Sequence, residues 1–124
     1  MASRRFQRVQ SLSREVKIVH AKVAIGASGA PTLDSNSVGI ASVVRDSAGV
    51  YVVTLEDTYN NLLHVDVMQI AASAEDLTFQ VESEDVASAK TVQIQSKAAA
   101  VETDPSDGST LLIRMELKNT SVPR

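Results

Sequence analysis

The chain has 124 residues, 12 Lys and Arg against 15 Asp and Glu, and neither Cys nor Trp. This length fits one domain with its own core, and 44% apolar with 22% charged residues is typical of globular proteins. The lack of cysteine excludes disulfides, thiol nucleophiles and Cys-ligated metal sites, and no apolar run is long enough for a membrane helix. The amino terminus also lacks the apolar segment of a secretory signal, so we expect a soluble protein that is not exported by that route.

Charge is distributed unevenly along the chain. Residues 1–17 hold five basic side chains and one acidic one, whereas the remaining residues hold seven and 14. We therefore divide the chain into a basic amino-terminal arm, 1–17, and a single β-sandwich domain, 18–124. The residues of the arm that we expect to bind a partner are Arg4, Arg5, Phe6, Arg8, Arg14 and Lys17.

The arm is compatible with extended or helical structure. Phe6, Val9 and Leu12 recur every three residues, as in a short amphipathic helix, but an isolated helix of this length is marginal in water. A solvated terminus is the alternative. Its basic residues can contact an acidic protein or the phosphates of a nucleic acid. Nucleic acid is the less favoured partner, because Phe6 is the only aromatic residue available for base stacking.

The rest of the chain reads as short strands. Residues 16–25 form the first, although Val16 and Ile18 fall in one register and the next apolar residues in the other, which predicts a bulge or burial on both faces. A turn follows at 26–31. Residues 38–45 and 50–56 are predicted to pair as an antiparallel hairpin, because Gly49 can take a positive φ at the end of the short loop 46–49.

Four more segments show the alternation of a half-buried strand. Residues 77–84 and 91–97 are predicted to form a second hairpin across 85–90, and residues 62–70 and 110–118 are further strands. The side chains expected to face the core, in these segments and in 50–56, are Tyr51, Val53 and Leu55; Leu63, Val65 and Val67; Leu77, Phe79 and Val81; Val92 and Ile94; and Leu111, Ile113, Met115 and Leu117. About seven short strands with frequent turns predict an all-β fold, an antiparallel β-sandwich or jelly roll.

The expected core is poor in aromatic residues, with two Tyr and two Phe in the whole chain. Met68 and Leu112 fall on the outward side of their strands, which favours cover by a second copy of the chain. We expect a homodimer in preference to a trimer.

No catalytic or metal-binding pattern stands out. The only histidines are His20 and His64, and neither has a recognisable nucleophile or third metal ligand nearby in the sequence. The segment 104–108 resembles part of a calcium loop, but Met115 occupies the position of the essential Glu, so a tight turn with an Asp cap is the better interpretation. We expect no enzyme, metal, cofactor, small-molecule substrate or membrane partner.

Two regions resemble small virion proteins of tailed bacteriophages. The first comprises Gly39–Val43, Gly49–Asp57, Tyr59 and Leu62–Leu63, and the second comprises Asp104–Thr110 and Leu117–Val122, together about a quarter of the chain. These are strand-and-turn patterns without a catalytic signature. The resemblance implies a non-enzymatic decoration or cement protein that assembles in the bacterial cytoplasm, binds the outside of the capsid and bridges major capsid protein subunits. A tail, neck or fibre-attachment component is the alternative.

Overall fold

The computed structural model describes residues 16–119, and these residues contain nine β-strands and one short 3-10 turn. The strands are β1 (Val16–Ile25), β2 (Pro31–Leu33), β3 (Ile40–Ser47), β4 (Val50–Leu55), β5 (Asn61–Ile70), β6 (Leu77–Asp85), β7 (Thr91–Ala98), β8 (Val101–Glu102) and β9 (Thr110–Lys118); the turn η1 is Ala27–Gly29. The sequence predicted about seven strands. The two additional ones, β2 and β8, have three and two residues, too few to show an alternation.

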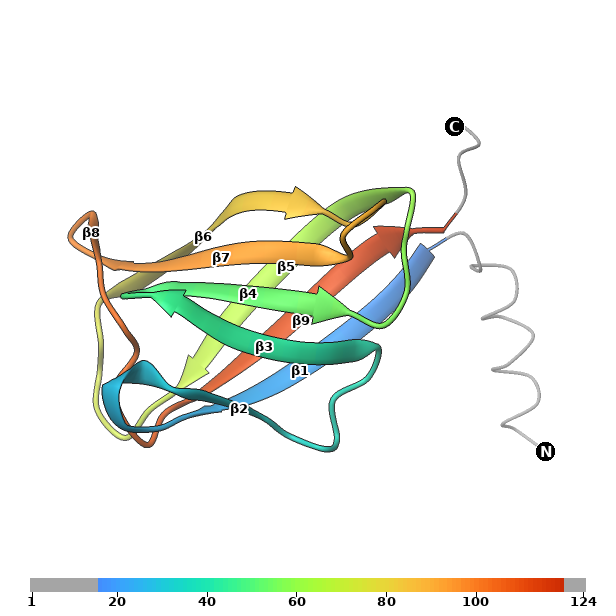
Figure 1. The fold of residues 1–124 in the computed structure, drawn as a ribbon. Helices are drawn as coiled ribbons and strands as arrows, with labels where there is room; N and C mark the ends of the chain where they lie inside the picture. The colour runs from blue at the N-terminus through green and yellow to red at the C-terminus, as the bar shows by residue number, and fades with distance from the viewer. Residues whose placement is uncertain (1–15, 120–124) are drawn as a thin grey trace.

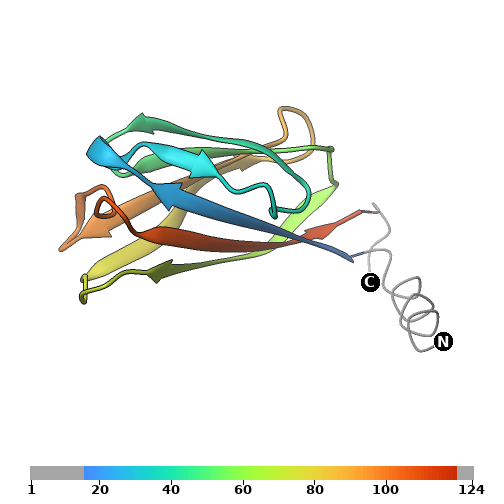
Figure 2. The same ribbon diagram turned by 90° about the horizontal axis from the view of Figure 1, so that it is seen from below.

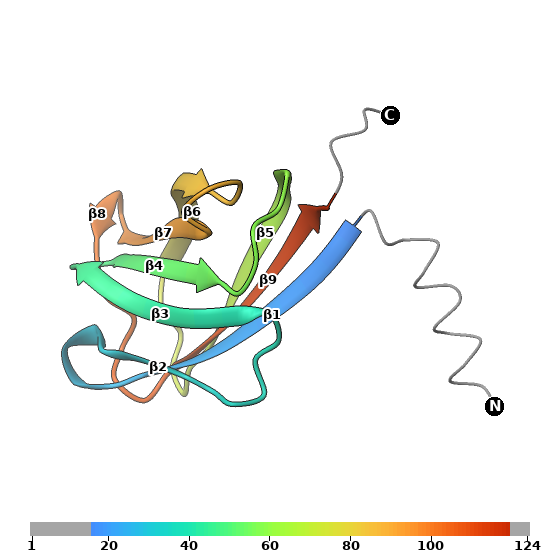
Figure 3. The same ribbon diagram turned by 45° about the vertical axis from the view of Figure 1, so that its right-hand side comes forward.

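The strands form two antiparallel sheets that pack face to face (Figures 1 and 3). One sheet has the order β2-β1-β9-β5, and the other has the order β3-β4-β7-β6 with β8 beside β7. The all-β prediction is confirmed at this level, as are the two hairpins, β3 with β4 and β6 with β7. The amino-terminal end of β1 and the carboxyl-terminal end of β9 lie at the same end of the sandwich, opposite the β3–β4 turn (Figure 1).

The core fills the space between the sheets. Its fully buried members come from the inward positions of β1, β4, β7 and β9, and they are mostly Val, Ile and Leu: Val23, Val53, Leu55, Val92, Ile94, Met115 and Leu117. Period-two alternation places these side chains inward, as the sequence predicted for 50–56, 91–97 and 110–118. Figure 2 shows the two layers from below.

Two strands differ from their sequence interpretation. β1 has no bulge, because its register with β9 runs unbroken from Val16 opposite Lys118 to Ala24 opposite Thr110, so Val16 and Ile18 are exposed on the outer face. β5 does have an irregularity between Leu62 and His64, which turns Leu63 outward and leaves Leu62 packed on the core. A one-residue insertion reverses the sides of a strand, and alternation alone does not reveal it.

Candidate functional site

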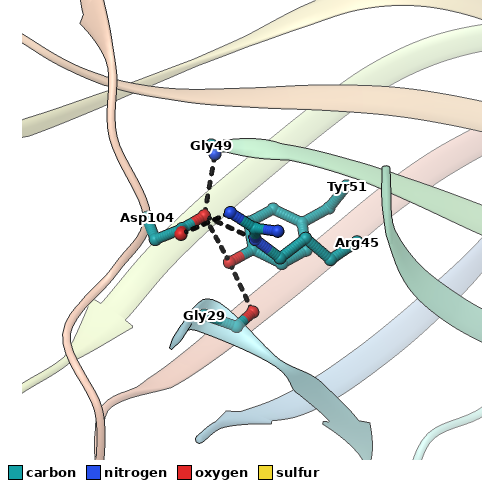
Figure 4. A network of polar contacts seen from close by, with 5 residues as sticks. All are labelled: Gly29, Arg45, Gly49, Tyr51 and Asp104. Carbon is teal, nitrogen blue, oxygen red and sulfur yellow. Dashed lines mark hydrogen bonds and ion pairs between the residues drawn. The ribbon is translucent and has the colours of Figure 1, made fainter. Parts of the chain in front are cut away.

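The best-organised polar cluster lies at the end of the sandwich with the β3–β4 turn. It consists of Gly29, Arg45, Gly49, Tyr51 and Asp104, and we call it the Asp104 clamp (Figure 4). Arg45 donates from Nε and Nη2 to the two Asp104 carboxylate oxygens at 3.0 and 2.9 Å. The Gly49 amide donates to Asp104 Oδ1 at 2.8 Å, and the Tyr51 hydroxyl donates to the Gly29 carbonyl at 2.8 Å. The clamp therefore joins segments of both sheets.

Two glycines make this close approach feasible. Gly29 and Gly49 have φ of +74° and +72°, a region that residues with a Cβ seldom adopt. A Cβ on Gly49 would lie 2.5 Å from the Ser96 carbonyl oxygen, and one on Gly29 would lie 2.5 Å from the Asp104 carboxyl carbon. Backbone and carboxylate thus occupy the space that any other side chain would need.

The electrostatics of the clamp hold each group in one charge state. The hydrogen bond from Arg45, reinforced by the Gly49 amide, lowers the pKa of Asp104 below its ordinary value. Burial, with the nearby Asp104 charge, raises the pKa of Tyr51 to about 12, so its hydroxyl keeps its proton. A bidentate guanidinium–carboxylate pair with a protonated phenol is the chemistry of a structural tie. We therefore assign the clamp to the stability of the fold.

The sequence predicted a tight turn with an Asp cap at 104–108, but the carboxylate of Asp104 is engaged by the clamp and does not cap that turn. That turn is closed instead by Ser109, whose amide and hydroxyl donate to the Ser106 carbonyl at 3.1 and 2.7 Å. Ser106 in turn donates a hydrogen bond to the carboxylate of Glu75, which lowers the pKa of Glu75. The carboxylate of Asp104 reaches residues more than 50 positions away, and nothing local in the sequence marks that contact.

The second candidate site is the outer face of the β2-β1-β9-β5 sheet, which we call the apolar face. Ten large hydrophobic side chains in the described part of the chain are exposed, and seven of them stand on this face: Val16, Ile18, Val38, Leu63, Met68, Ile70 and Leu112. Met68 is opposite Leu112 across the β5–β9 pair, and both point outward, as the sequence predicted. Met68 is the most exposed of the ten, at 68%.

A hollow of about 350 Å³ lies on the apolar face, beside Met68. The segment that follows β2 forms one wall, and it is held to β1 by the Lys22 amide, which donates to Ser37 Oγ at 3.0 Å. The His20–Val38 backbone pair continues this attachment. The lining includes His20, Lys22, Ser37, Met68, Leu112 and Arg114.

Several charged groups of the apolar face pair with one another. His64 Nε2 lies 3.1 Å from Asp66, and Arg114 lies 2.8 Å from Glu116 and 4.0 Å from Asp66. Lys22 and Lys118 stand on the same face, so the face presents both signs of charge with a small basic excess. Residues 16–119 contain no group of three or more His, Asp or Glu able to hold a metal ion.

The outer face of the β3-β4-β7-β6 sheet, which we call the polar face, is of a different kind. Gln93 donates to Glu82 at 2.7 Å, and Gln95 donates to Glu82 and, at 3.4 Å, to Glu102. Val44 is the exposed large hydrophobic side chain here, at 56%. This amide and carboxylate ladder is typical of a solvated sheet surface.

The edge strands β5 and β6 border a third feature. Two hollows of about 400 and 340 Å³ lie between them, and Val67 and Phe79 line both. Neither strand has a further strand on its outer edge within the described residues. We call this border between β5 and β6 the seam.

Of the arm residues expected to bind a partner, Arg4, Arg5, Phe6, Arg8 and Arg14 lie outside the described residues. Lys17 lies inside β1, opposite Leu117 of β9, so the sheet begins before the boundary that charge suggested. The sequence identified Met68 and Leu112 on the apolar face, but not Val38, which is brought there by the segment after β2.

Comparison with known proteins finds no matching family model, no similar curated protein and no similar solved structure. Within the described residues, no helix is long and apolar enough to cross a membrane. The site geometry therefore carries the functional argument, together with the sequence resemblance given above.

Proposed function

We propose that the protein is a non-enzymatic structural component of a tailed-phage virion that binds the outside of the capsid and bridges major capsid protein subunits. The observation that carries the proposal is that the protein pairs its polar groups internally but leaves large apolar side chains exposed. The most organised ionisable groups are committed to the Asp104 clamp, whereas large apolar side chains are left exposed together on one face. This is the arrangement of a protein that works by association.

The resemblance of Gly49–Asp57 and Asp104–Thr110 to small phage virion proteins supports the same class. In the structure these segments form β4 with its turn and the loop before β9, which are the segments that the clamp ties together. The patterns that carry the resemblance are thus patterns of a rigid β domain.

The basic arm is the proposed capsid anchor. Arg4, Arg5, Arg8 and Arg14 would pair with acidic groups of major capsid protein, each exposed pair contributing about 0.2 to 1 kcal/mol. Single pairs of this strength hold weakly and are screened by salt. Many copies on one shell raise the effective concentration of every arm, which makes modest contacts sufficient.

Immunogold labelling of intact virions with an antibody against the recombinant chain tests the location. Label spread over the head is the expected result. Label confined to the tail would overturn the capsid assignment in favour of a tail, neck or fibre-attachment component, and virions without label would overturn both.

Deleting residues 1–15 tests the anchor. We expect weaker binding to capsids and an unchanged circular dichroism spectrum, because β1 begins at Val16. Lys97→Gln removes one positive charge from β7 and serves as the control. Unchanged capsid affinity at physiological salt would contradict the role of the arm, and DNA binding by the full chain that weakens steeply with salt would indicate nucleic acid as its partner instead.

A further inference from the structure

We infer that the apolar face is the interface between two copies of this chain, which pack it face to face around a two-fold axis. Seven exposed hydrophobic side chains stand there among charged ones, and a concentration of exposed apolar side chains on one face of a domain marks an interaction site. The inference stands apart from the proposed capsid role, because it concerns the chain alone.

The shape of the face suits a copy of itself. A two-fold interface brings the same patch together from both partners, so the patch must contain its own complement. Met68 projects from β5 beside the hollow of about 350 Å³ that Leu112 and the 34–38 segment line. In a two-fold pair, the flexible Met68 side chain of each copy can enter the hollow of the other.

The charges of the face lead to the same occupant. Asp66, Arg114 and Glu116 are already paired within one chain, so Lys22 beside the hollow is the charge that a partner has to match when the face is buried. A strongly basic partner would be repelled by Lys22, and a strongly acidic one would be repelled by Asp66 and Glu116. A second copy, with the same mixed row of charges, does match.

The extent of the face is adequate for a dimer. β1 and β5 have ten residues each and β9 has nine. With about 4.8 Å between strands and about 3.3 Å per residue, three long strands and the edge segment cover roughly 500 to 600 Å² in projection. The accessible surface of the side chains is larger, which approaches the roughly 800 Å² per partner of a standard interface.

Light scattering after size exclusion tests the inference. The wild-type chain at tens of micromolar is expected at twice its mass of 13.2 kDa. Met68→Lys and Leu112→Lys should each weaken the dimer by roughly 100-fold, because each would bury an unpaired charge. Both positions are exposed in the single chain, so circular dichroism should show an unchanged fold.

Two matched variants locate the contact. Val44→Lys places the same charge on the polar face and Val81→Lys places it on β6 beside the seam, and both should leave the dimer intact. A monomeric wild-type chain would overturn the inference, as would a dimer that Val44→Lys or Val81→Lys disrupts while Met68→Lys does not. If the full chain were monomeric and a chain of residues 16–124 dimeric, the amino-terminal residues would be the occupant instead.

Discussion

The Asp104 clamp and the apolar face differ in how far their side chains are buried and paired within the chain. In the clamp, charged and polar groups are withdrawn from solvent and given partners within the chain, with Tyr51 only 2% exposed. On the apolar face, the large hydrophobic side chains of Met68 and Leu112 are left exposed to solvent. The first arrangement stabilises the fold of a single chain, and the second adds nothing to that fold. Substitutions should therefore separate stability from association.

The largest effect is expected for Gly49→Ala. The new Cβ would meet backbone atoms of Ser96 and Thr103 at 2.5 and 2.7 Å, at a positive φ. Strain and overlap together should lower the free energy of unfolding by roughly 3 to 5 kcal/mol. Urea denaturation followed by circular dichroism measures this.

Gly108→Ala is the matched control for that prediction. Gly108 also has a positive φ, of +88°, but nothing lies within 4 Å of its added Cβ. Gly108→Ala should lower the free energy of unfolding by only about 1 kcal/mol, the contribution of backbone strain. Equal losses for both glycines would show that the close approach at Gly49 is unimportant.

The next largest effect is expected for Asp104→Asn, which removes the carboxylate that Arg45 and Gly49 share. After allowance for partial exposure, about 1 to 2 kcal/mol of stability should be lost at neutral pH. Asp107→Asn, in the same loop and exposed, should change stability by less than about 0.5 kcal/mol. Similar losses for the two variants would argue against the clamp.

At acidic pH, the wild-type chain should lose its greater free energy of unfolding relative to Asp104→Asn. The pKa of Asp104 is lowered in the fold, so its stabilisation is present above the unfolded value of about 3.9 and is lost as the pH falls through the folded value. The gap between the two unfolding curves should therefore narrow below about pH 4. Glu75, whose pKa is also lowered, keeps some acid sensitivity in the variant. A gap that stays constant down to pH 2 would contradict the assignment.

Tyr51→Phe should have a smaller effect, about 1 kcal/mol, because it removes one buried hydrogen bond to the Gly29 carbonyl and retains the ring. Tyr59→Phe removes a half-buried hydroxyl for which the described residues show no hydrogen bond, and it should be nearly neutral. Thermal unfolding of both variants measures the difference. Indistinguishable midpoints would show that the Tyr51 hydroxyl is not part of the clamp.

The smallest effect on folding is expected on the apolar face. Leu112→Ala should change the free energy of unfolding of the single chain by less than about 0.5 kcal/mol, measured at a concentration low enough to avoid association. Its neighbour Leu111 faces the core at 2% exposure, and Leu111→Ala should cost about 2 to 5 kcal/mol. A large loss for Leu112→Ala would mean that the face contributes to the fold of one chain, contrary to the comparison.

Local patterns predicted much of the fold. The alternation in 110–118 predicted every inward residue of β9, and Gly49 predicted the β3–β4 hairpin. The pattern was wrong where register changed: Leu63 was expected inward, but the irregularity in β5 turns it outward. It was wrong also at β1, where the mixed pattern predicted a bulge or burial on both faces, whereas the register is unbroken and Val16 and Ile18 are exposed.

The candidate sites were predictable only in part. Met68 and Leu112 were predicted to face outward because each alternates with inward-facing residues along its own strand. Arg45 and Asp104 are 59 residues apart, and no spacing rule connects them. Even the opposition of Met68 to Leu112 depends on the pairing of β5 with β9, and no local pattern connects two residues that are 44 positions apart.

Local sequence patterns were enough to predict the all-β fold of residues 16–119 and the inward side of most strands, because the two-residue period of a strand is a local property of the backbone. They did not predict which strands are neighbours, and therefore not which polar groups meet in the clamp. The strand order places seven exposed hydrophobic side chains on one sheet and a ladder of amides and carboxylates on the other. Contacts between distant segments depend on sheet order and register, and these are set by the packing of the whole domain.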